Sequence, residues 1–476
     1  MSDVLYIIVV VCLLAIWVPA LLFSMQMFQQ NSYKVDRFLR WSHGKVFRKF
    51  WKRGTKVKFV MTPRMWRLFF TATLIFAVLC IFRLYIPAAL ALIFTDYTMI
   101  LANALNVPIN KAVSNWYVKD AKRILAAHKD LVIIGVTGSY GKTSTKNYLY
   151  RMLSEKYNTL ITPGNFNTTM GVVRTIREYL KPYHQVFIVE MGAKQVGDIK
   201  EICDLVHPVI GVVTSVGQMH LETFKTVENI QKTKFELIRS LPSDGLGVIN
   251  MDSEGIASYG DIPDNCRIVR YGIKSEAVDY KAENISCSAS GTDFDVNGTH
   301  IHTSLVGDCN ILNILAAVAV ADRLEVSADK QRIAASKLQQ VEHRLSVSLK
   351  GGMTILDDAY NSNPEGARMA LDVLGRLSLP DGARRIVVTP GFVELGARQE
   401  SEDRLLGEEI AGVADILIIV NRYNRDALFS GARSAGMPED RIICADTLAG
   451  AVQHLSGLTK PGDAILYEND LPDTFK

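Results

Sequence analysis

The stretch Leu131-Val-Ile-Ile-Gly-Val-Thr-Gly-Ser-Tyr-Gly-Lys-Thr-Ser144 joins an apolar run to a glycine-rich turn that ends in Gly-Lys-Thr. The apolar run predicts a buried parallel strand, and residues 145–155 predict a helix. A turn of this kind between strand and helix predicts a phosphate-binding loop, because its glycines let backbone amides point toward phosphate. Lys142 would place a cation on the β- and γ-phosphates, and Thr143 would offer a hydroxyl to Mg²⁺. The spacing differs from the usual G-x-x-x-x-G-K-S/T, since five residues separate Gly135 from Gly141 and two separate Gly138 from Gly141, and a turn without a ligand is the alternative.

Length and composition limit the class of protein. A chain of 476 residues is too long for one hydrophobic core and suggests about three domains. The net charge of +4 is mild, and the seven cysteines include no C-x-x-C pair. A zinc ribbon and a disulfide framework are therefore disfavoured, and the soluble part is predicted to be reduced and intracellular.

The N-terminal region reads as a membrane region. Residues 4–25 are almost wholly apolar and long enough to cross a bilayer. A cleaved signal peptide is the alternative, but no basic segment precedes the run and no small-x-small cleavage site follows it. Residues 33–67 then carry twelve Lys and Arg against one acid, Asp36, with aromatic residues interleaved. A nucleic-acid arm is one interpretation. A cytoplasmic segment on anionic lipid is favoured because apolar stretches flank it, and no nucleic-acid partner is expected.

A second apolar region runs from residue 68 to about 107 and is broken by Arg83, Pro87 and Asp96. It is too long for one span. Two passes, at about 66–82 and 86–105, would return the phosphate-binding loop to the side of the membrane that holds ATP. Three spans are therefore predicted, with a re-entrant hairpin as a variant and catalytic domains in the cytoplasm of a bacterium. Residues 108–130 are expected to form a connector.

The remainder alternates strand-like and helix-like segments, which is typical of an α/β fold. Buried strands are predicted at 186–190, 209–214 and 247–250, giving a doubly wound ATP-binding domain over 131–345 with an edge sheet within 265–305. The pattern resets near residue 345. A smaller, Rossmann-like α/β domain is predicted over 346–476. Its expected strands are 353–358, 385–389, 416–420 and 464–467. The membrane region is predicted over 1–107.

Several polar residues fall where predicted strands end. Glu190 closes one strand and could complete Mg²⁺ coordination opposite Thr143, the alternative being a solvated acid. His220 follows the strand that ends near Thr214, although a single histidine is more often structural. Asn361 and Asn363 lie in a polar loop after a strand, where a capped turn before a helix is the simpler interpretation.

Nine motifs together, in order and over more than half the chain, resemble the Mur ligases, the ATP-dependent amide-forming enzymes of peptidoglycan synthesis. The resemblance is closest to the branch that adds D-alanyl-D-alanine. The motifs are Gly135-Val-Thr-Gly-Ser-Tyr-Gly-Lys-Thr-Ser144, Thr162-Pro-Gly-Asn-Phe-Asn-Thr-Thr-Met-Gly171, Glu190-Met-Gly-Ala193, Gly217-Gln-Met-His-Leu-Glu222, Lys232-Thr-Lys-Phe-Glu236, Gly307-Asp-Cys-Asn-Ile-Leu-Asn313, His343-Arg-Leu345, Asp357-Asp-Ala-Tyr-Asn-Ser-Asn-Pro364 and Glu394-Leu-Gly396.

The resemblance implies ATP and two Mg²⁺ ions as cofactors and assigns site residues. It implies catalytic roles for Lys142, His220, Arg344 and Lys234, the last as a carbamylated lysine. The implied nucleotide-binding residues are Thr137, Gly138, Ser139, Gly141, Lys142, Thr143 and Ser144 at the phosphates, Asn310 and Asn313 near adenine, and Arg344 and Asp358 near phosphate and ribose. The implied metal ligands are Thr143, Glu190, His220 and Lys234, and the implied substrate contacts are Asn165, Asn167, Thr168, Asn361 and Asn363.

The resemblance also implies a reaction. ATP would phosphorylate a carboxylate to an acyl phosphate, and an amine would then displace phosphate to give an amide. The expected enzyme is a membrane-anchored ligase that adds an amino acid or dipeptide to a cell-wall precursor. Its expected partners are the lipid bilayer, the acceptor and the amine.

Two departures from the family pattern concern substrates. The family begins with a domain that grips UDP, whereas this chain begins with its membrane region, so a lipid-linked acceptor is one hypothesis. The family usually ends its last strand with Lys-Gly-Ser-Arg, whereas this chain has an acidic stretch that includes Glu468 and Asp470. A cationic amine in place of D-alanyl-D-alanine is the matching hypothesis. A polyglutamate-type synthase and a non-catalytic membrane scaffold are alternatives, as is an amidating ligase with a glutaminase partner.

Overall fold

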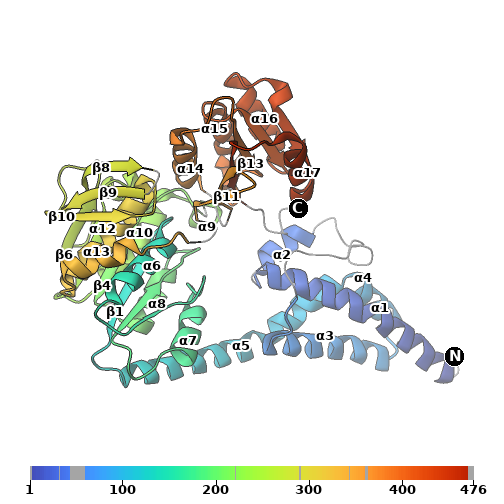
Figure 1. The fold of residues 1–476 in the computed structure, drawn as a ribbon. Helices are drawn as coiled ribbons and strands as arrows, with labels where there is room; N and C mark the ends of the chain where they lie inside the picture. Colours follow the sequence, from blue (N-terminus) through green and yellow to red (C-terminus); the bar gives the residue numbers. More distant parts are fainter. Residues whose placement is uncertain are drawn as a thin grey trace. The chain divides into compact units, whose positions relative to one another are not determined.

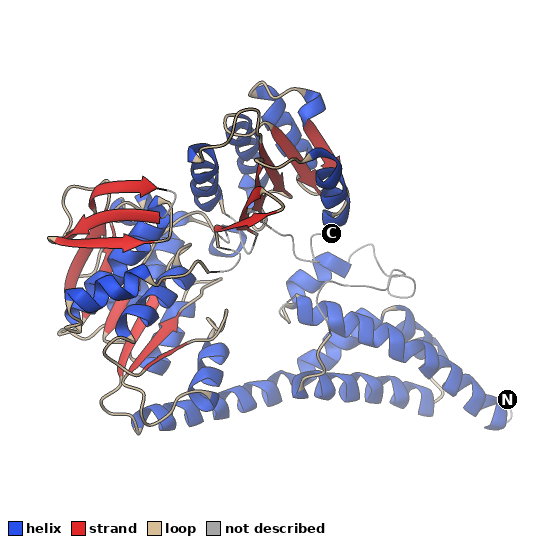
Figure 2. Cartoon of the chain, in the orientation of Figure 1, coloured by secondary structure: helices blue, strands red, loops and turns tan. Residues whose placement is uncertain are grey.

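The computed structural model describes residues 3–31, 33–42, 59–219, 221–288, 291–341, 344–359 and 363–469. The chain divides into two compact units, Met1–Tyr117 and Val118–Asp470. Helices dominate the described part of the first unit, whereas the second is an α/β structure with three sheets (Figures 1 and 2).

The first unit contains two helices that are long and apolar enough to cross a membrane, Ile8–Gln30 and Pro63–Ile81. They agree with the spans predicted at 4–25 and 66–82. The helices pack through a core in which Trp17 stacks on Phe76 at 4.3 Å between ring centroids. The helices of this unit are α1 (Asp3–Gln30), α2 (Val35–Ser42), α3 (Pro63–Ile81), α4 (Tyr85–Ile93) and the first part of α5 (Thr95–Ala126).

The third span was predicted at about 86–105, with a re-entrant hairpin as a variant, and in the structure this stretch is not one continuous helix. The chain breaks at Phe94, and α4 and α5 meet at a bend of 93°. The Thr95 hydroxyl donates to the carbonyl of Leu92 and so satisfies a group that the break releases from the helix. Nine residues rise only about 14 Å, so α4 alone cannot cross a hydrocarbon core of about 30 Å. The bent pair is a broken span or a re-entrant loop.

Helix α5 does not change character at residue 107, where the membrane region was predicted to end. It continues through Pro108 to Ala126, so most of the predicted connector is helical. Two of its buried polar side chains have partners on other helices of the first unit. Asp96 accepts a hydrogen bond from Ser24 at 2.5 Å, and Asn106 donates to Thr71 at 3.0 Å. Hydrogen bonds of this kind join neighbouring helices.

A seven-stranded sheet forms the centre of the second unit, and all its neighbouring strands are parallel in the order β2-β3-β1-β4-β5-β6-β7. The predicted strands at 186–190, 209–214 and 247–250 are confirmed as β3, β4 and β5. The strands are β1 (Val132–Thr137), β2 (Thr159–Ile161), β3 (Val186–Glu190), β4 (Ile210–Val213), β5 (Leu246–Asn250), β6 (Arg267–Gly272) and β7 (Tyr280–Lys281).

Helices cover both faces of this sheet. Ile134 and Val136 pack in one core with α6 and α12, whereas Gly135, on the opposite face, meets Leu237 of α10. The helices are α6 (Lys142–Leu153), α7 (Thr169–Glu178), α8 (Asp198–Val206), α9 (Leu221–Phe224), α10 (Val227–Arg239), α11 (Glu254–Ala257), α12 (Asp308–Arg323) and α13 (Ala328–Ser336). The predicted edge sheet is also present, as the antiparallel strands β8 (Glu283–Ser288), β9 (Gly291–Val296) and β10 (Thr299–Thr303).

A row of glycines lets α10 lie close to the sheet. Gly135, Gly211 and Gly247 are register partners on three neighbouring strands. A Cβ at Gly135 would stand 2.6 Å from Leu237, and one at Gly211 would stand 2.9 Å from the same side chain. We call these three residues the glycine row. Because α10 carries Lys234, the row sets how closely that lysine approaches the sheet.

A six-stranded sheet follows, in the order β11-β12-β16-β13-β14-β15, with only the β11–β12 pair antiparallel. All four strands predicted after residue 346 are confirmed. The strands are β11 (Ser346–Lys350), β12 (Met353–Asp358), β13 (Arg385–Thr389), β14 (Ile416–Val420), β15 (Ile442–Ala445) and β16 (Ala464–Glu468). The helices are α14 (Pro364–Arg376), α15 (Gln399–Ala411), α16 (Arg425–Ser434) and α17 (Leu448–Leu458). The domain limits given above remain predictions.

Candidate active site

The glycine-rich turn between β1 and α6 forms a tight loop. Gly138 and Gly141 have positive φ values of 154° and 79°, a conformation that other residues rarely adopt. Neither position has room for a side chain, because a Cβ would stand 2.0 Å from Thr214 Oγ1 at Gly138 and 2.7 Å from Asn313 Oδ1 at Gly141. Lys142 Nζ donates to the carbonyls of Gly138 and Ser139 at 2.6 and 3.0 Å. The loop thus wraps around its own lysine at the N-terminus of α6.

The segment after β4 supports this loop from the other side. Ser139 Oγ and the backbone of Gly217 exchange hydrogen bonds of 2.9 and 3.1 Å. The amide of Tyr140 donates to Ser215 Oγ at 2.8 Å. The side chain of Tyr140 points elsewhere: its hydroxyl hydrogen-bonds to Glu365 of α14 and to Ser253, and burial raises its pKa.

Glu190, at the end of β3, is the centre of a buried polar cluster. Its Oε2 lies 3.2 Å from Thr143 Oγ1 and 3.0 Å from Lys146 Nζ, and its Oε1 accepts from Asn167 at 3.1 Å. Burial alone would raise the pKa of Glu190, but Lys146 and Lys142 outweigh it and the pKa is lowered. Glu190 is therefore a charged carboxylate and not the solvated strand-end acid of the alternative interpretation.

The donors at this point suit Mg²⁺. A hydroxyl and a carboxylate oxygen are hard ligands, and Thr143 and Glu190 already lie within hydrogen-bond distance. No group of three or more His, Cys, Asp or Glu that could hold a metal occurs among the residues that the structure describes. Mg²⁺ commonly takes phosphate oxygens and water as its other ligands.

Two buried lysines, Lys142 and Lys234, interact electrostatically. Lys234, on α10, is only 4% exposed. Burial, with the charge of Lys142 added, lowers the pKa of Lys234 to about 7, and burial lowers the pKa of Lys142 to about 8. At neutral pH much of Lys234 is therefore an uncharged amine, the form that can act as a nucleophile.

The two asparagines expected near adenine bond to α6. Asn310 accepts from the Tyr148 hydroxyl at 2.7 Å and donates to the carbonyl of Val306. Asn313 accepts from Thr145 at 2.9 Å. Both side chains are buried, so they brace the first turns of α6 behind the glycine-rich loop.

Arg344 acts electrostatically on both Asp358 and Lys142. The guanidinium of Arg344 opposes the effect of burial, which raises the pKa of Asp358, and it also lowers the pKa of Lys142. Glu468 is the register partner of Asp358 on the adjacent strand and is 1% exposed. It thus lies within the carboxyl edge of the six-stranded sheet. Asp470, the other acid of the cationic-amine hypothesis, lies outside the described residues.

The predicted substrate contacts are divided. Asn167 touches Glu190, whereas Thr168 and Asn363 cap α7 and α14, accepting from Gly171 and Gly366. The capped turn considered for Asn363 is thus present. Asn165 is exposed. His220 and Asn361 lie outside the described residues, so their roles remain predictions.

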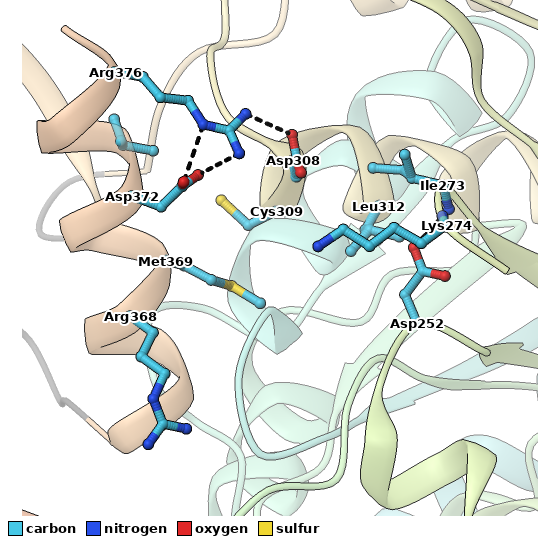
Figure 3. Close-up of a pocket in the computed structure, with 11 residues that line it drawn as sticks. Asp252, Ile273, Lys274, Asp308, Cys309, Leu312, Arg368, Met369, Asp372 and Arg376 are labelled. Atoms are coloured by element: carbon cyan, nitrogen blue, oxygen red, sulfur yellow. Dashed lines mark hydrogen bonds and ion pairs between the residues drawn. The ribbon is translucent and has the colours of Figure 1, made fainter. Parts of the chain in front are cut away.

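A cavity of about 320 Å³ lies between α12 and α14 (Figure 3). Asp308, Cys309 and Leu312 line it from α12, and α14 closes the other side. Figure 3 shows Arg376 of α14 joined to Asp372 and Asp308, at 2.9 and 3.8 Å. Among the described residues, none that was predicted to bind nucleotide lines this cavity.

Comparisons with known proteins agree with this geometry. The model of the Mur ligase middle domain matches residues 136–321, and that of the Mur ligase glutamate ligase domain matches residues 343–467. A UDP-N-acetylmuramoyl-tripeptide–D-alanyl-D-alanine ligase of Mycobacterium bovis is 33% identical over 369 residues, covering 71% of this chain and 70% of the relative. The corresponding Escherichia coli enzyme is 29% identical over 306 residues, covering 63% and 67%. The chain belongs to the Mur ligase family.

Solved Mur ligase structures share the fold. MurF from Acinetobacter baumannii superposes with a TM-score of 0.67 and 25% identity, over 75% of this chain and 77% of that one. MurF from Thermotoga maritima in complex with ADP superposes with a TM-score of 0.65 and 26% identity, over 75% and 80%. This Mur ligase is therefore an ATP-dependent, ADP-forming enzyme. The alternative hypothesis of a non-catalytic membrane scaffold is excluded.

Sequence reasoning missed two residues of this Mur ligase site. Lys146 pairs with Glu190 and also donates to the carbonyls of Thr162 and Gly164 at 3.0 and 2.9 Å. Its signal was available, since a lysine four residues after Lys142 lies on the same side of a helix. Glu365 was missed because only the fold brings it to Tyr140.

Proposed function

We propose that this Mur ligase adds D-alanyl-D-alanine to the carboxylate of UDP-N-acetylmuramoyl-tripeptide with consumption of ATP. The observation that carries the proposal is the cluster of Lys142, Thr143, Glu190 and Lys146 around the glycine-rich loop. The relatives that match the chain are named for this reaction. A polyglutamate-type synthase would use the same ATP site but would yield products of many lengths.

The glycine-rich loop would hold the phosphates of ATP. Lys142 Nζ donates to two loop carbonyls in this structure, and we infer that it donates to phosphate oxygens instead when nucleotide binds. Thr143 and Glu190 would hold Mg²⁺, which supplies positive charge next to the phosphates when bound. Lys146 and Asn167 keep the Glu190 carboxylate in place. Thr137 and Ser139 do not reach outward but fix the loop, bonding to Met191 and Gly217.

The carboxylate of the acceptor would attack the γ-phosphate of ATP to give an acyl phosphate and ADP. Both reactants are anionic, so the barrier depends on cations fixed in place before the reaction. Lys142 and Arg344 are such cations, since the field of Arg344 reaches Lys142. An amine then displaces phosphate and forms the amide.

Lys234 is proposed to be carbamylated, as the family resemblance implies. The structure is compatible with that chemistry, because a lysine with a pKa of about 7 presents a free amine to CO₂ at neutral pH. Carbamylation would replace a buried potential cation with an anion near Lys142, whose charge already acts on Lys234.

We further propose that the enzyme is an integral protein of the bacterial cytoplasmic membrane with its catalytic unit in the cytoplasm. Two helices of the first unit are long and apolar enough to cross. Many large apolar side chains on α3 are exposed, including Phe70 at 62% and Leu74 at 64%, which suits contact with lipid. ATP is available only on the cytoplasmic side.

A lipid-linked acceptor is the second candidate, and one observation favours it. The family match begins at residue 136, and the helices of the first unit precede it where the family has its UDP-gripping domain. A membrane region in that place could bring the enzyme to an acceptor that is itself in the membrane.

ADP release by the full-length protein in detergent tests the proposal. We expect turnover with UDP-N-acetylmuramoyl-tripeptide plus D-alanyl-D-alanine. Lys142→Ala should abolish it, whereas Lys129→Ala, at an exposed lysine, should not change it. Turnover only with a lipid extract as acceptor would overturn the UDP-linked acceptor, and a ladder of product lengths would indicate a polyglutamate-type synthase.

A further inference from the structure

Glu365 occupies an unusual place for a surface-helix carboxylate. It lies in the first turn of α14, yet its side chain packs against the segment that follows β4. A Cβ at Gly217 would stand 2.4 Å from Glu365 Oε2 and 2.8 Å from its carboxyl carbon. Gly217 in turn exchanges hydrogen bonds with Ser139 of the glycine-rich loop. Gly217 therefore links this carboxylate to the loop that would hold the phosphates.

The hydrogen-bonding capacity of the Glu365 carboxylate is only partly satisfied among the described residues. The Tyr140 hydroxyl hydrogen-bonds to Glu365, but Oε2 is buried and has no hydrogen-bond partner among the described residues. Gln218, the neighbour of Gly217, also has a buried oxygen, Oε1, without a partner in the described part of the chain. Two buried acceptors without a donor are costly. A group with several N–H donors and no acceptor suits such atoms, and an ammonium group fits that description.

We propose that Glu365 and Gln218 receive the ammonium group of the incoming amine, and that Glu365 accepts its proton before attack. The inference rests on the proposed function, because it assigns the second substrate of that reaction. In the balanced step, Glu365 takes one proton from the ammonium, and the freed lone pair forms the C–N bond with the acyl carbon. The C–O bond to phosphate breaks, and phosphate leaves with the bonding electrons and the second proton.

The surroundings of Glu365 suit a proton acceptor. Burial raises its pKa, with Glu254 of α11 adding to the effect and Arg368, one turn further along α14, opposing it. Tyr140 donates from the glycine-rich loop and so keeps the carboxylate oriented. A base works best when its pKa lies closer to the working pH than that of an ordinary carboxylate.

The test separates the two half-reactions. Acyl phosphate can be trapped as a hydroxamate by hydroxylamine, a nucleophile that is largely unprotonated at neutral pH and needs no base. For Glu365→Gln we expect the rate with D-alanyl-D-alanine to fall about 100-fold or more, with hydroxamate formation within about threefold of wild type. The rate of the variant with D-alanyl-D-alanine should climb with pH, because free amine then enters from solution, whereas the wild-type rate levels off.

Glu400→Gln is the matched control. Glu400 also lies in the first turn of a helix, α15, but it is exposed, so its loss should change neither rate. An unchanged rate of Glu365→Gln with D-alanyl-D-alanine, or an equal loss of both rates by folded protein, would overturn the proposal.

A second variant tests the site independently, in case Glu365→Gln does not fold. Gln218→Met keeps the size of the side chain but removes its acceptor, and we expect a higher KM for D-alanyl-D-alanine with no change in the KM for ATP. A KM that rises for both substrates, or for neither, would count against the site. Wild-type protein that forms no hydroxamate with the tripeptide acceptor would instead contradict the proposed function.

Discussion

Glu190 depends on a second lysine that is not part of the glycine-rich loop. The side chains of Lys146 and Glu190 are 1% and 2% exposed, and their charged atoms are 3.0 Å apart. Removing one partner of such a pair leaves the other charge buried and uncompensated, which is far more costly than losing a surface pair. Lys146 therefore helps to hold Glu190, the proposed metal ligand, in its ionised form.

Lys146→Gln should lower the free energy of unfolding by about 3 kcal/mol. Added Mg²⁺ should recover part of that loss, because a cation at Glu190 replaces the missing charge. Thermal denaturation with and without Mg²⁺ measures both effects. Lys156→Gln, at an exposed lysine 3.8 Å from Glu325, is the control and should cost less than about 1 kcal/mol. Equal costs for the two variants would show that Lys146 is not essential to the cluster.

The lowered pKa of Lys234 gives stability a predictable pH dependence. Its pKa is about 7 in the folded protein and 10.5 at its usual value, so between these pH values the unfolded chain binds the extra proton. The free energy of unfolding should therefore rise with pH across this window, by about 1.4 kcal/mol per pH unit from this group.

Chemical denaturation at several pH values in CO₂-free buffer checks this. Lys234→Met should lose its share of the slope, so its stability relative to wild type should fall as the pH rises from 7 toward 10. Identical slopes for the two proteins would mean that Lys234 is charged in the folded state.

At the scale of elements, the approach of α10 to the sheet depends on the glycine row. Gly211→Ala would place a methyl group 2.9 Å from Leu237, and α10 would have to move. We expect a loss of about 1–3 kcal/mol in stability, together with lower activity because Lys234 moves with the helix. Gly457→Ala is the control, since nothing lies within 4 Å of that position in α17. It should be neutral or stabilising. A Gly211→Ala variant with normal activity would argue against this coupling.

The elements of the second unit were predictable because buried parallel strands are short apolar runs bounded by turn residues. β3, β4, β5 and the four strands predicted after residue 346 all follow that pattern. The break at Phe94 was not predictable, because Phe94 is apolar like its neighbours and the bend depends on how α4 and α5 pack. Similarly, Lys142 was predictable from the Gly-Lys-Thr motif. Glu365 was not, because it reaches the loop only through contacts between distant segments.

At the scale of the whole molecule, membrane attachment has two possible physical sources with different responses to salt. Attraction between a basic segment and anionic lipid is screened by added salt, whereas burial of apolar helices in lipid is not. We expect the full-length protein to stay in the membrane pellet at high salt and at alkaline pH, and to be released by detergent. Cell fractionation with immunoblotting measures this, with a known peripheral protein as control. Release by salt alone would contradict a spanning anchor.

The glycine row also limits how the gene can change. Every single-base change in the first two positions of a glycine codon brings in a residue with a Cβ or a stop codon. At Gly135, Gly211 and Gly247 that atom would meet a neighbour within 3 Å. These three positions should therefore tolerate almost no substitution in a saturation mutagenesis library. Much of the intolerance to mutation in this enzyme should therefore lie on the face of the sheet under α10.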